Sequence, residues 1–138
     1  MTLTIVYWSG TGNTEAMANL VAEGAKGAGV AVNCKSVDRA KADDLAADVL
    51  ALGCPAMGDE VLEEGEFEPW LDSVLAQLAG RKVALFGAYD WGDGQWMRDW
   101  TRRMTDAGVV LAAESLIVHN APEGDDAERC RSFGRSLA

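Results

Sequence analysis

The sequence has few basic residues, and this shortage excludes two classes of protein. Lys and Arg number 12 against 22 Asp and Glu, which leaves a formal net charge of −10. Proteins that bind nucleic acids or dock on anionic membranes rely on basic surfaces, so the balance argues against both kinds of partner. The same negative charge favours partners with basic surfaces.

Cysteine and histidine are also scarce. Cys34, Cys54 and Cys130 form no CxxC pair, and His119 is the single histidine. An odd cysteine count without such spacing predicts neither a disulfide framework nor a metal site. Residues 1–5 lack the features of a signal peptide, and no apolar run approaches the roughly 20 residues of a membrane span. We therefore expect a cytoplasmic protein with reduced thiols and no membrane partner.

Short apolar runs alternate along the chain with segments of helical periodicity. A chain of 138 residues, 49% of them hydrophobic, has room for one domain, expected to span 1–138. The patterns predict strands over 3–8, 30–37, 49–52, 83–86 and 109–118, and helices over 14–25, 43–47, 67–78, 96–107 and 130–137. This alternation predicts an α/β fold, a doubly wound parallel sheet with helices on both faces. Trp70, Trp96 and Trp100 lie on helix faces and are expected in the core.

Three loops of unusual composition, 9–14, 54–66 and 87–94, follow the first, third and fourth predicted strands. The carboxyl ends of parallel strands share one edge of a sheet, and α/β folds bind their ligands there. We therefore expect the three loops to converge on one site.

The first of these loops has the composition of a phosphate cradle. It joins a strand to a helix, and a helix N-terminus offers free N–H groups to an anion. Gly10 and Gly12 let the backbone bend around a ligand. The loop contains no lysine, which excludes a Walker A motif, and Glu15 breaks the GxGxxG pattern. The loop indicates a site for one terminal phosphate; a helix cap made of turn residues is the alternative.

The other two loops contribute negative charge and an aromatic ring. Six acidic residues and no basic one lie between Asp59 and Glu68, and a solvated acidic face would explain most of them. Trp91 lies among glycines and aspartates, where it can stack on a flat ring or pack locally within its loop. Together the loops favour a flat, phosphate-bearing redox cofactor. The sequence contains no Ser-His-Asp set and no cysteine beside a base, so nothing in it indicates hydrolysis.

The motifs in these loops resemble those of the short-chain flavodoxins of anaerobic bacteria. The matching segments are 5–15 (IVYWSGTGNTE), 56–61 (AMGDEV), Tyr89 with 91–94 (WGDG), and 96–99 (WMRD). The resemblance covers essentially the whole chain, and 111–118 has no room for the insertion of the long-chain members. It implies the flavodoxin-like five-stranded parallel sheet in the order 2-1-3-4-5, with FMN as cofactor.

The resemblance also implies which residues bind FMN. They are Trp8, Ser9, Gly10, Thr11, Gly12, Asn13 and Thr14 in the first loop, Pro55, Ala56, Met57, Gly58, Asp59 and Glu60 in the second, and Gly87, Ala88, Tyr89, Asp90, Trp91 and Gly92 in the third.

By the same resemblance, Ser9, Thr11, Asn13 and Thr14 would hold the phosphate with the N–H groups of Gly10 and Gly12. Trp91 and Met57 would cover the two faces of the ring, and Glu60 would accept a hydrogen bond from flavin N3–H. The Gly58 carbonyl would turn toward N5–H on reduction, and Asp90 and Trp91 would offer N–H groups to the pyrimidine carbonyl. Pro55, Ala88 and Asp90 replace the residues commonest in the family.

The function implied is low-potential one-electron transfer, mainly between semiquinone and hydroquinone, by a monomeric protein that is not an enzyme. Its partners would be reductases and oxidoreductases with basic docking surfaces. One alternative is a flavodoxin-like NAD(P)H:quinone or flavin reductase, which needs a nicotinamide site that the sequence does not suggest. A response-regulator receiver is the other alternative. It needs paired aspartates and a lysine where Trp8-Ser9 and His119-Asn120 stand.

Overall fold

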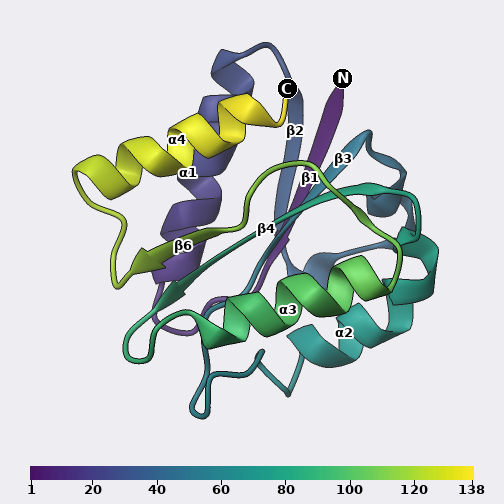
Figure 1. Cartoon of the computed structure of the whole chain (residues 1–138). Helices are drawn as coiled ribbons and strands as arrows, with labels where there is room; N and C mark the ends of the chain where they lie inside the picture. The colour runs from purple at the N-terminus through teal and green to yellow at the C-terminus, as the bar shows by residue number, and fades with distance from the viewer.

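A computed structural model describes all 138 residues as one sheet with helices on both of its faces (Figure 1). The strands are β1 (Thr2–Tyr7), β2 (Ala31–Ser36), β3 (Val49–Gly53), β4 (Lys82–Tyr89), β5 (Val110–Leu111) and β6 (Leu116–His119). The α-helices are α1 (Asn13–Gly27), α2 (Phe67–Val74), α3 (Gln95–Asp106) and α4 (Asp125–Ser136), and 3-10 helices occupy Val37–Arg39, Ala42–Ala46 and Leu75–Leu78.

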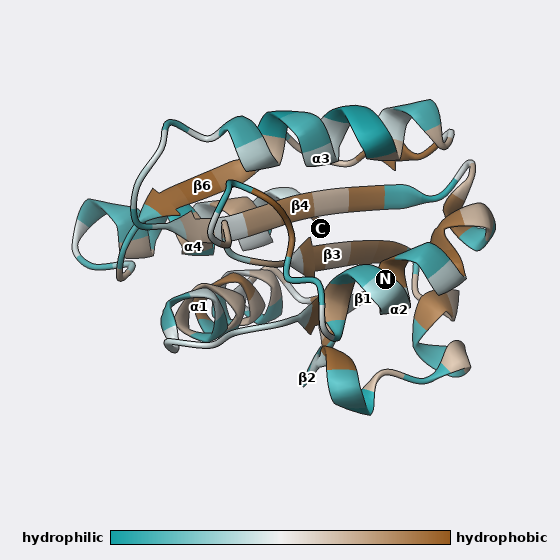
Figure 2. Cartoon of the chain, turned by 90° about the horizontal axis from the view of Figure 1, so that it is seen from below, coloured by the Kyte–Doolittle hydropathy of each residue, from teal (hydrophilic) through white to brown (hydrophobic).

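All strands pair in parallel, in the order β2-β1-β3-β4-β5, and β6 pairs with β4 beyond the end of β5. This confirms the order expected from the family resemblance. Helices α1 and α4 cover one face and α2 and α3 the other, so β3 is buried along its whole length. Figure 2 shows much of β3, β4 and β6 in brown and most of α3 in teal.

The sheet separates two hydrophobic cores. The core under α2 and α3 contains Phe67, Trp96 and Trp100. The rings of Phe67 and Trp100 meet edge to face, with centroids 5.5 Å apart. Trp70 is only half-buried at the margin of this core, so the prediction that it is a core residue is wrong.

The core under α1 and α4 depends on the absence of side chains where these helices cross. A Cβ at Gly24 would lie 1.9 Å from the carbonyl oxygen of Arg131, and one at Gly134 would lie 2.0 Å from that of Val21. Such distances are far inside van der Waals contact. Both glycines are therefore needed for the close approach of the two helices.

Several predicted boundaries differ from the structure, and the last helix begins at Asp125 rather than at 130. Strand β4 does not end at Gly87 but continues to Tyr89, because its last residues pair with β6. The predicted strand over 109–118 is divided into β5 and β6, which leaves 112–115 outside any strand. The predicted helix over 67–78 changes at Leu75 into a 3-10 helix.

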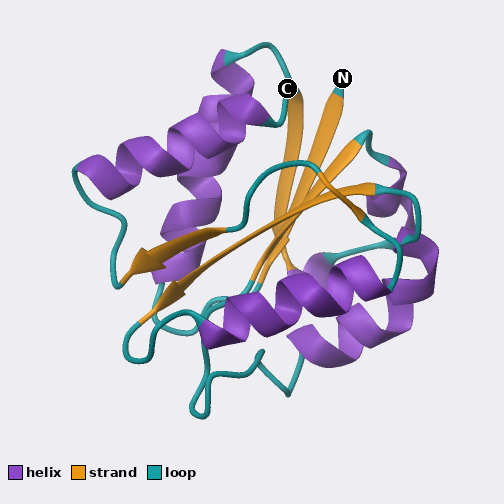
Figure 3. Cartoon of the chain, in the orientation of Figure 1, coloured by secondary structure: helices purple, strands orange, loops and turns teal.

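The loops that follow β1, β3 and β4 gather at the carboxyl edge of the sheet, as the sequence predicted. Figure 3 shows them together, in teal, at the end of the molecule opposite the two chain termini. No helix combines the length and the apolar character that crossing a membrane requires.

Candidate functional site

A cavity of about 280 Å³ opens where the three loops meet. Its walls come from every loop that the sequence singled out. The lining residues are Trp8, Gly10, Thr11, Asn13, Pro55, Ala56, Met57, Gly58, Ala88, Tyr89, Asp90, Trp91 and Asn120. Asn120, at the end of β6, is the one residue of this wall that the sequence analysis missed. Its only sequence signal was its place directly after an apolar strand.

The remaining predicted residues lie around this cavity rather than in its wall. Ser9 and Gly12 line a neighbouring cavity, and Thr14 is buried. The hydroxyl oxygen of Thr14 accepts the N–H of Ala88 at 3.4 Å, which joins the start of α1 to β4. Thr14 therefore supports the site from behind. A Cβ built on Gly87 would lie 2.2 Å from the carbonyl oxygen of Cys54, so Gly87 packs directly against this carbonyl.

The loop between β1 and α1 presents unpaired backbone donors. The N–H groups of Gly10, Thr11, Asn13 and Thr14 donate to no acceptor within the protein. They precede or begin α1, where the helix dipole adds a partial positive charge. This donor set, without a charged side chain, suits a phosphate.

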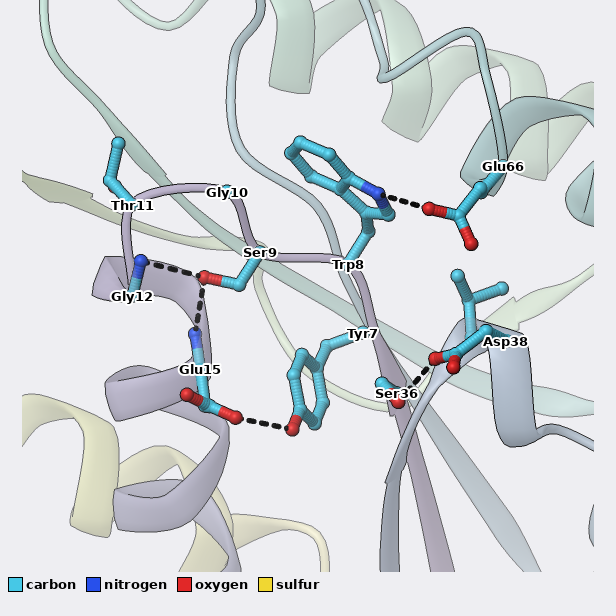
Figure 4. A pocket seen from close by; sticks show the side chains of 11 residues that line it. Tyr7, Trp8, Ser9, Gly10, Thr11, Gly12, Glu15, Ser36, Asp38 and Glu66 are labelled. Carbon is cyan, nitrogen blue, oxygen red and sulfur yellow. Dashed lines mark hydrogen bonds between the residues drawn. The ribbon is translucent and has the colours of Figure 1, made fainter.

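One expected donor is already used within the loop. The hydroxyl oxygen of Ser9 accepts the N–H groups of Gly12 at 3.1 Å and Glu15 at 3.2 Å (Figure 4). In this structure the Gly12 N–H is therefore engaged within the loop. Ser9 holds the loop in shape, and Gly12 provides the left-handed turn into α1 with φ of 97°.

The loop after β3 forms a small hairpin over the cavity. Met57 and Val61 exchange two backbone hydrogen bonds, of 2.9 and 3.3 Å, and Gly58 lies in the turn between them. The left-handed residue of this turn is Glu60, with φ of 57°, and not Gly58. A Cβ at Gly58 would meet nothing within 4 Å, so the side-chain position of this residue is open.

Glu60 carries a buried oxygen that lacks a partner. Its Oε1 is shielded from solvent and makes no hydrogen bond. A Cβ on Gly92 would lie 2.2 Å from this atom, so the carboxylate reaches across to the third loop. Buried polar atoms without partners are rare because each one costs free energy. The oxygen is therefore well suited to accept an N–H from a bound ligand.

Trp91 projects from the third loop with 60% of its surface exposed. An indole packed within its own loop would be largely covered, so the interpretation of Trp91 as local packing does not hold. A large exposed aromatic side chain beside a cavity suits stacking on a flat ring.

Half of the acidic run from Asp59 to Glu68 has partners inside the protein. Both carboxylate oxygens of Glu63 accept backbone N–H groups at the start of α2, from Gly65, Glu66 and Phe67 at 2.7–2.8 Å. Burial opposes ionisation there, but these donors outweigh it and lower the pKa of Glu63 below its usual value.

Two further carboxylates in this run pair with side chains. The Glu66 carboxylate accepts the indole N–H of Trp8 at 3.2 Å, and Glu68 pairs with Arg103 at 2.9 Å. The expectation that a solvated acidic face explains most of the run therefore applies only to its other members, Asp59 and Glu64 among them.

A second cavity, of about 510 Å³, lies on the other side of Trp8 (Figure 4). Its walls include Glu15, Asp38 and Glu66 and no basic side chain. The Tyr7 hydroxyl donates to Glu15 at 2.9 Å, and burial together with this carboxylate raises the pKa of Tyr7 to about 12. Three carboxylates would repel a phosphate, so the smaller cavity is the better candidate for an anionic ligand.

The cysteines do not supply a nucleophile to either cavity. Burial raises the pKa of Cys54 to about 12 and the pKa values of Cys34 and Cys130 to about 11. Reactive cysteines need a lowered pKa, because the thiolate is the nucleophile. No group of three or more His, Cys, Asp or Glu side chains is placed to hold a metal ion.

The chain is similar to known proteins over nearly its whole length. A profile of the flavodoxin family matches residues 5–134. The flavodoxin of Clostridium beijerinckii is 53% identical over 97% of this chain and 97% of its own length. The flavodoxin of Megasphaera elsdenii is 45% identical over 97% of this chain and 96% of its own length. The solution structure of two-electron reduced Megasphaera elsdenii flavodoxin superimposes with a TM-score of 0.89 at 42% identity, and covers 98% of this chain and 97% of its own.

Proposed function

The chain belongs to the flavodoxin family, and from that premise we propose that the cavity at the carboxyl edge of its sheet holds FMN. Flavodoxins are FMN-binding electron carriers and not enzymes, and this chain shares that function. The observation that carries the placement is the set of unpaired N–H groups of Gly10, Thr11, Asn13 and Thr14 beside the exposed ring of Trp91.

The phosphate would bind at the start of α1. The free N–H groups of Gly10, Thr11, Asn13 and Thr14 support this role, as do the side chains of Thr11 and Asn13. Thr14 retains a hydroxyl hydrogen that it can donate, because its oxygen serves as the acceptor for Ala88.

The flat ring would lie between Trp91 and Met57, which border the same cavity from different loops. Glu60 Oε1 would accept the N–H of the pyrimidine part of the ring, which would satisfy its missing hydrogen bond. The N–H groups of Asp90 and Trp91 have no acceptor in the protein and are available to a ring carbonyl. The Gly58 carbonyl would turn toward the ring on reduction.

FMN supplies the capacity to take up and release electrons one at a time. The chain contributes the environment that sets the energy of this exchange. Trp91 and Met57 would exclude water from the ring faces, and the carboxylates of Asp59, Glu60 and Asp90 would disfavour added negative charge nearby. A low reduction potential follows from this arrangement.

Redox proteins are the partners of an electron carrier. We propose that these partners dock through basic surfaces, because the net charge of −10 steers such encounters. We further propose that the chain acts as a monomer and folds as one domain over 1–138. The three free cysteines support a reducing, cytoplasmic location.

An absorption spectrum of the purified protein, followed by anaerobic titration with dithionite, tests the proposed function. We expect a yellow protein that takes up two electrons in separate one-electron steps. A colourless protein that does not bind added FMN would refute the assignment. Reduction of a quinone by NADPH without a separate reductase would instead support the flavin reductase alternative. The similarity of the chain to flavodoxins does not favour that alternative.

A further inference from the structure

The only histidine of the chain contacts the loop that carries Trp91. His119 is the last residue of β6 and lies opposite Tyr89 in the register with β4. Its Nε2 lies 2.8 Å from the carbonyl oxygen of Asp90, directly before Trp91. A carbonyl oxygen can only accept, so Nε2 carries the hydrogen of this bond.

The second ring nitrogen is also engaged. The side-chain amide of Asn120 lies 3.4 Å from Nδ1 of His119, in a position to donate to it. With the Asn120 amide donating to Nδ1, the hydrogen that reaches the Asp90 carbonyl lies on Nε2. Asn120 itself lines the cavity, and its backbone N–H donates to the carbonyl of Tyr89 at 2.8 Å.

This contact matters because the third loop has few others. His119 provides the only hydrogen bond from the protein to any backbone group of residues 90–92. The next bond along the loop is that of Arg98 to the carbonyl of Asp93 at 3.0 Å. Without His119, nothing but packing would fix the peptide between Asp90 and Trp91.

The imidazole is held in place by a row of three rings. Tyr89 lies between His119, at a centroid distance of 5.1 Å, and Trp96, at 5.7 Å. Trp96 is buried in the core, and its indole N–H donates to the carbonyl of Cys54 at 3.2 Å. The two outer rings, those of His119 and Trp96, thus each donate a ring N–H to a backbone carbonyl, and the two carbonyls belong to different loops of the site.

We propose that His119 is a positioning residue of the cofactor site, which orients the Asp90–Trp91 peptide through its Nε2–H. This proposal rests on the proposed function, since the ring and N–H of Trp91 are assigned there to the flavin. The hydrogen bond would reduce the number of conformations open to Trp91 before the cofactor arrives. Binding then costs less conformational entropy.

Two substitutions separate the hydrogen bond from the ring packing. His119→Phe keeps a ring beside Tyr89 and removes the donor, whereas His119→Gln keeps an N–H donor and removes the ring. We expect the dissociation constant of FMN from apoprotein to rise roughly 3- to 10-fold in His119→Phe, the effect of losing one hydrogen bond. We expect the dissociation constant of FMN from His119→Gln to lie within about twofold of the parent value. Equal binding by His119→Phe and the parent, or equal loss in both variants, would overturn the proposal.

A second readout needs no cofactor. Acrylamide quenching of the apoprotein, with the signal of Trp91 identified by its loss in Trp91→Phe, reports the freedom of this loop. We expect Trp91 to be quenched more strongly in His119→Phe than in the parent or in His119→Gln, with equal melting temperatures. Unchanged quenching would contradict the positioning role. Failure of the parent itself to bind FMN would refute the proposed function instead, while the quenching comparison would still decide whether His119 orders the loop.

Discussion

The backbone N–H of Glu63 points at the sulfur of Cys54, 3.4 Å away, and so closes the loop that leaves β3. The thiol of Cys54 can in turn donate to the carbonyl of Pro55, at 3.6 Å. The Glu63 carboxylate meanwhile caps the first turn of α2 through three backbone N–H groups. Glu63 therefore joins the hairpin over the cavity to the helix that follows it.

Removal of the Glu63 carboxylate is expected to destabilise the fold. Glu63→Ala leaves three N–H groups at the start of α2 without their acceptor, which is expected to cost about 1–2 kcal/mol of unfolding free energy. Urea denaturation of the apoprotein measures this cost. Glu64→Ala is the matched control, because Glu64 is exposed and makes no internal bond. Equal stability of the two variants would show that the cap contributes nothing.

A side chain at Gly92 is expected to weaken FMN binding at least 10-fold. Gly92→Ala places a Cβ 2.2 Å from Glu60 Oε1 and so displaces the carboxylate proposed to bind the ring. Gly29→Ala is the control, because Gly29 has the same φ of +87° but open space around it. Both variants share the backbone strain, and only Gly92→Ala has the clash. A fluorescence titration of the two apoproteins with FMN decides whether they differ.

Removal of the charge on Asp90 is expected to raise the potential of the second one-electron reduction. One charge at about 12 Å, with an effective dielectric of roughly 40, corresponds to roughly 30 mV, so we expect a rise of about 10–30 mV in Asp90→Asn. Asp93→Asn should give a smaller rise, because Arg98 already pairs with Asp93 at 2.9 Å. Spectroelectrochemical titration at constant salt measures both shifts. A fall in potential in Asp90→Asn would contradict this electrostatic account.

The stability of the fold is expected to depend on pH through Asp44. Burial alone would raise the pKa of this carboxyl, but the N–H of Lys41 at 2.7 Å and the ammonium of Lys35 at 3.0 Å lower it overall. A carboxyl with a lowered pKa in the folded state stabilises the protein above its unfolded pKa of about 3.9, and the contribution is lost as the pH falls through the folded pKa.

Asp44→Asn tests this dependence. We expect it to lower the unfolding free energy by about 1–3 kcal/mol at pH 7, since a partner of Lys35 is lost. The difference from the parent should narrow as the pH falls below about 4. Asp43→Asn should have little effect at either pH, because Asp43 is exposed. Denaturation curves at neutral and acidic pH make the comparison, and a deficit that does not change with pH would exclude the ionic contribution.

Much of the site followed from local sequence patterns. Glycines and hydroxyl side chains between a strand and a helix predicted the anion cradle, because a helix N-terminus leaves its N–H groups free in any fold. The acidic run was harder to interpret. A sequence pattern does not distinguish a carboxylate that faces water from one, such as Glu63, that caps a helix in the same segment.

What the sequence alone determined was the succession of strands and helices, since periodicity and turn residues act over a few neighbours. From this succession came the convergence of three loops at one edge of the sheet. Only the tertiary structure decided which atoms meet across those loops. His119 and Asp90 lie far apart in the chain, and β6 brings them together by pairing with β4 beyond the end of β5. The contact of His119 with the Asp90 carbonyl depends on that pairing, because it joins groups that no local pattern relates.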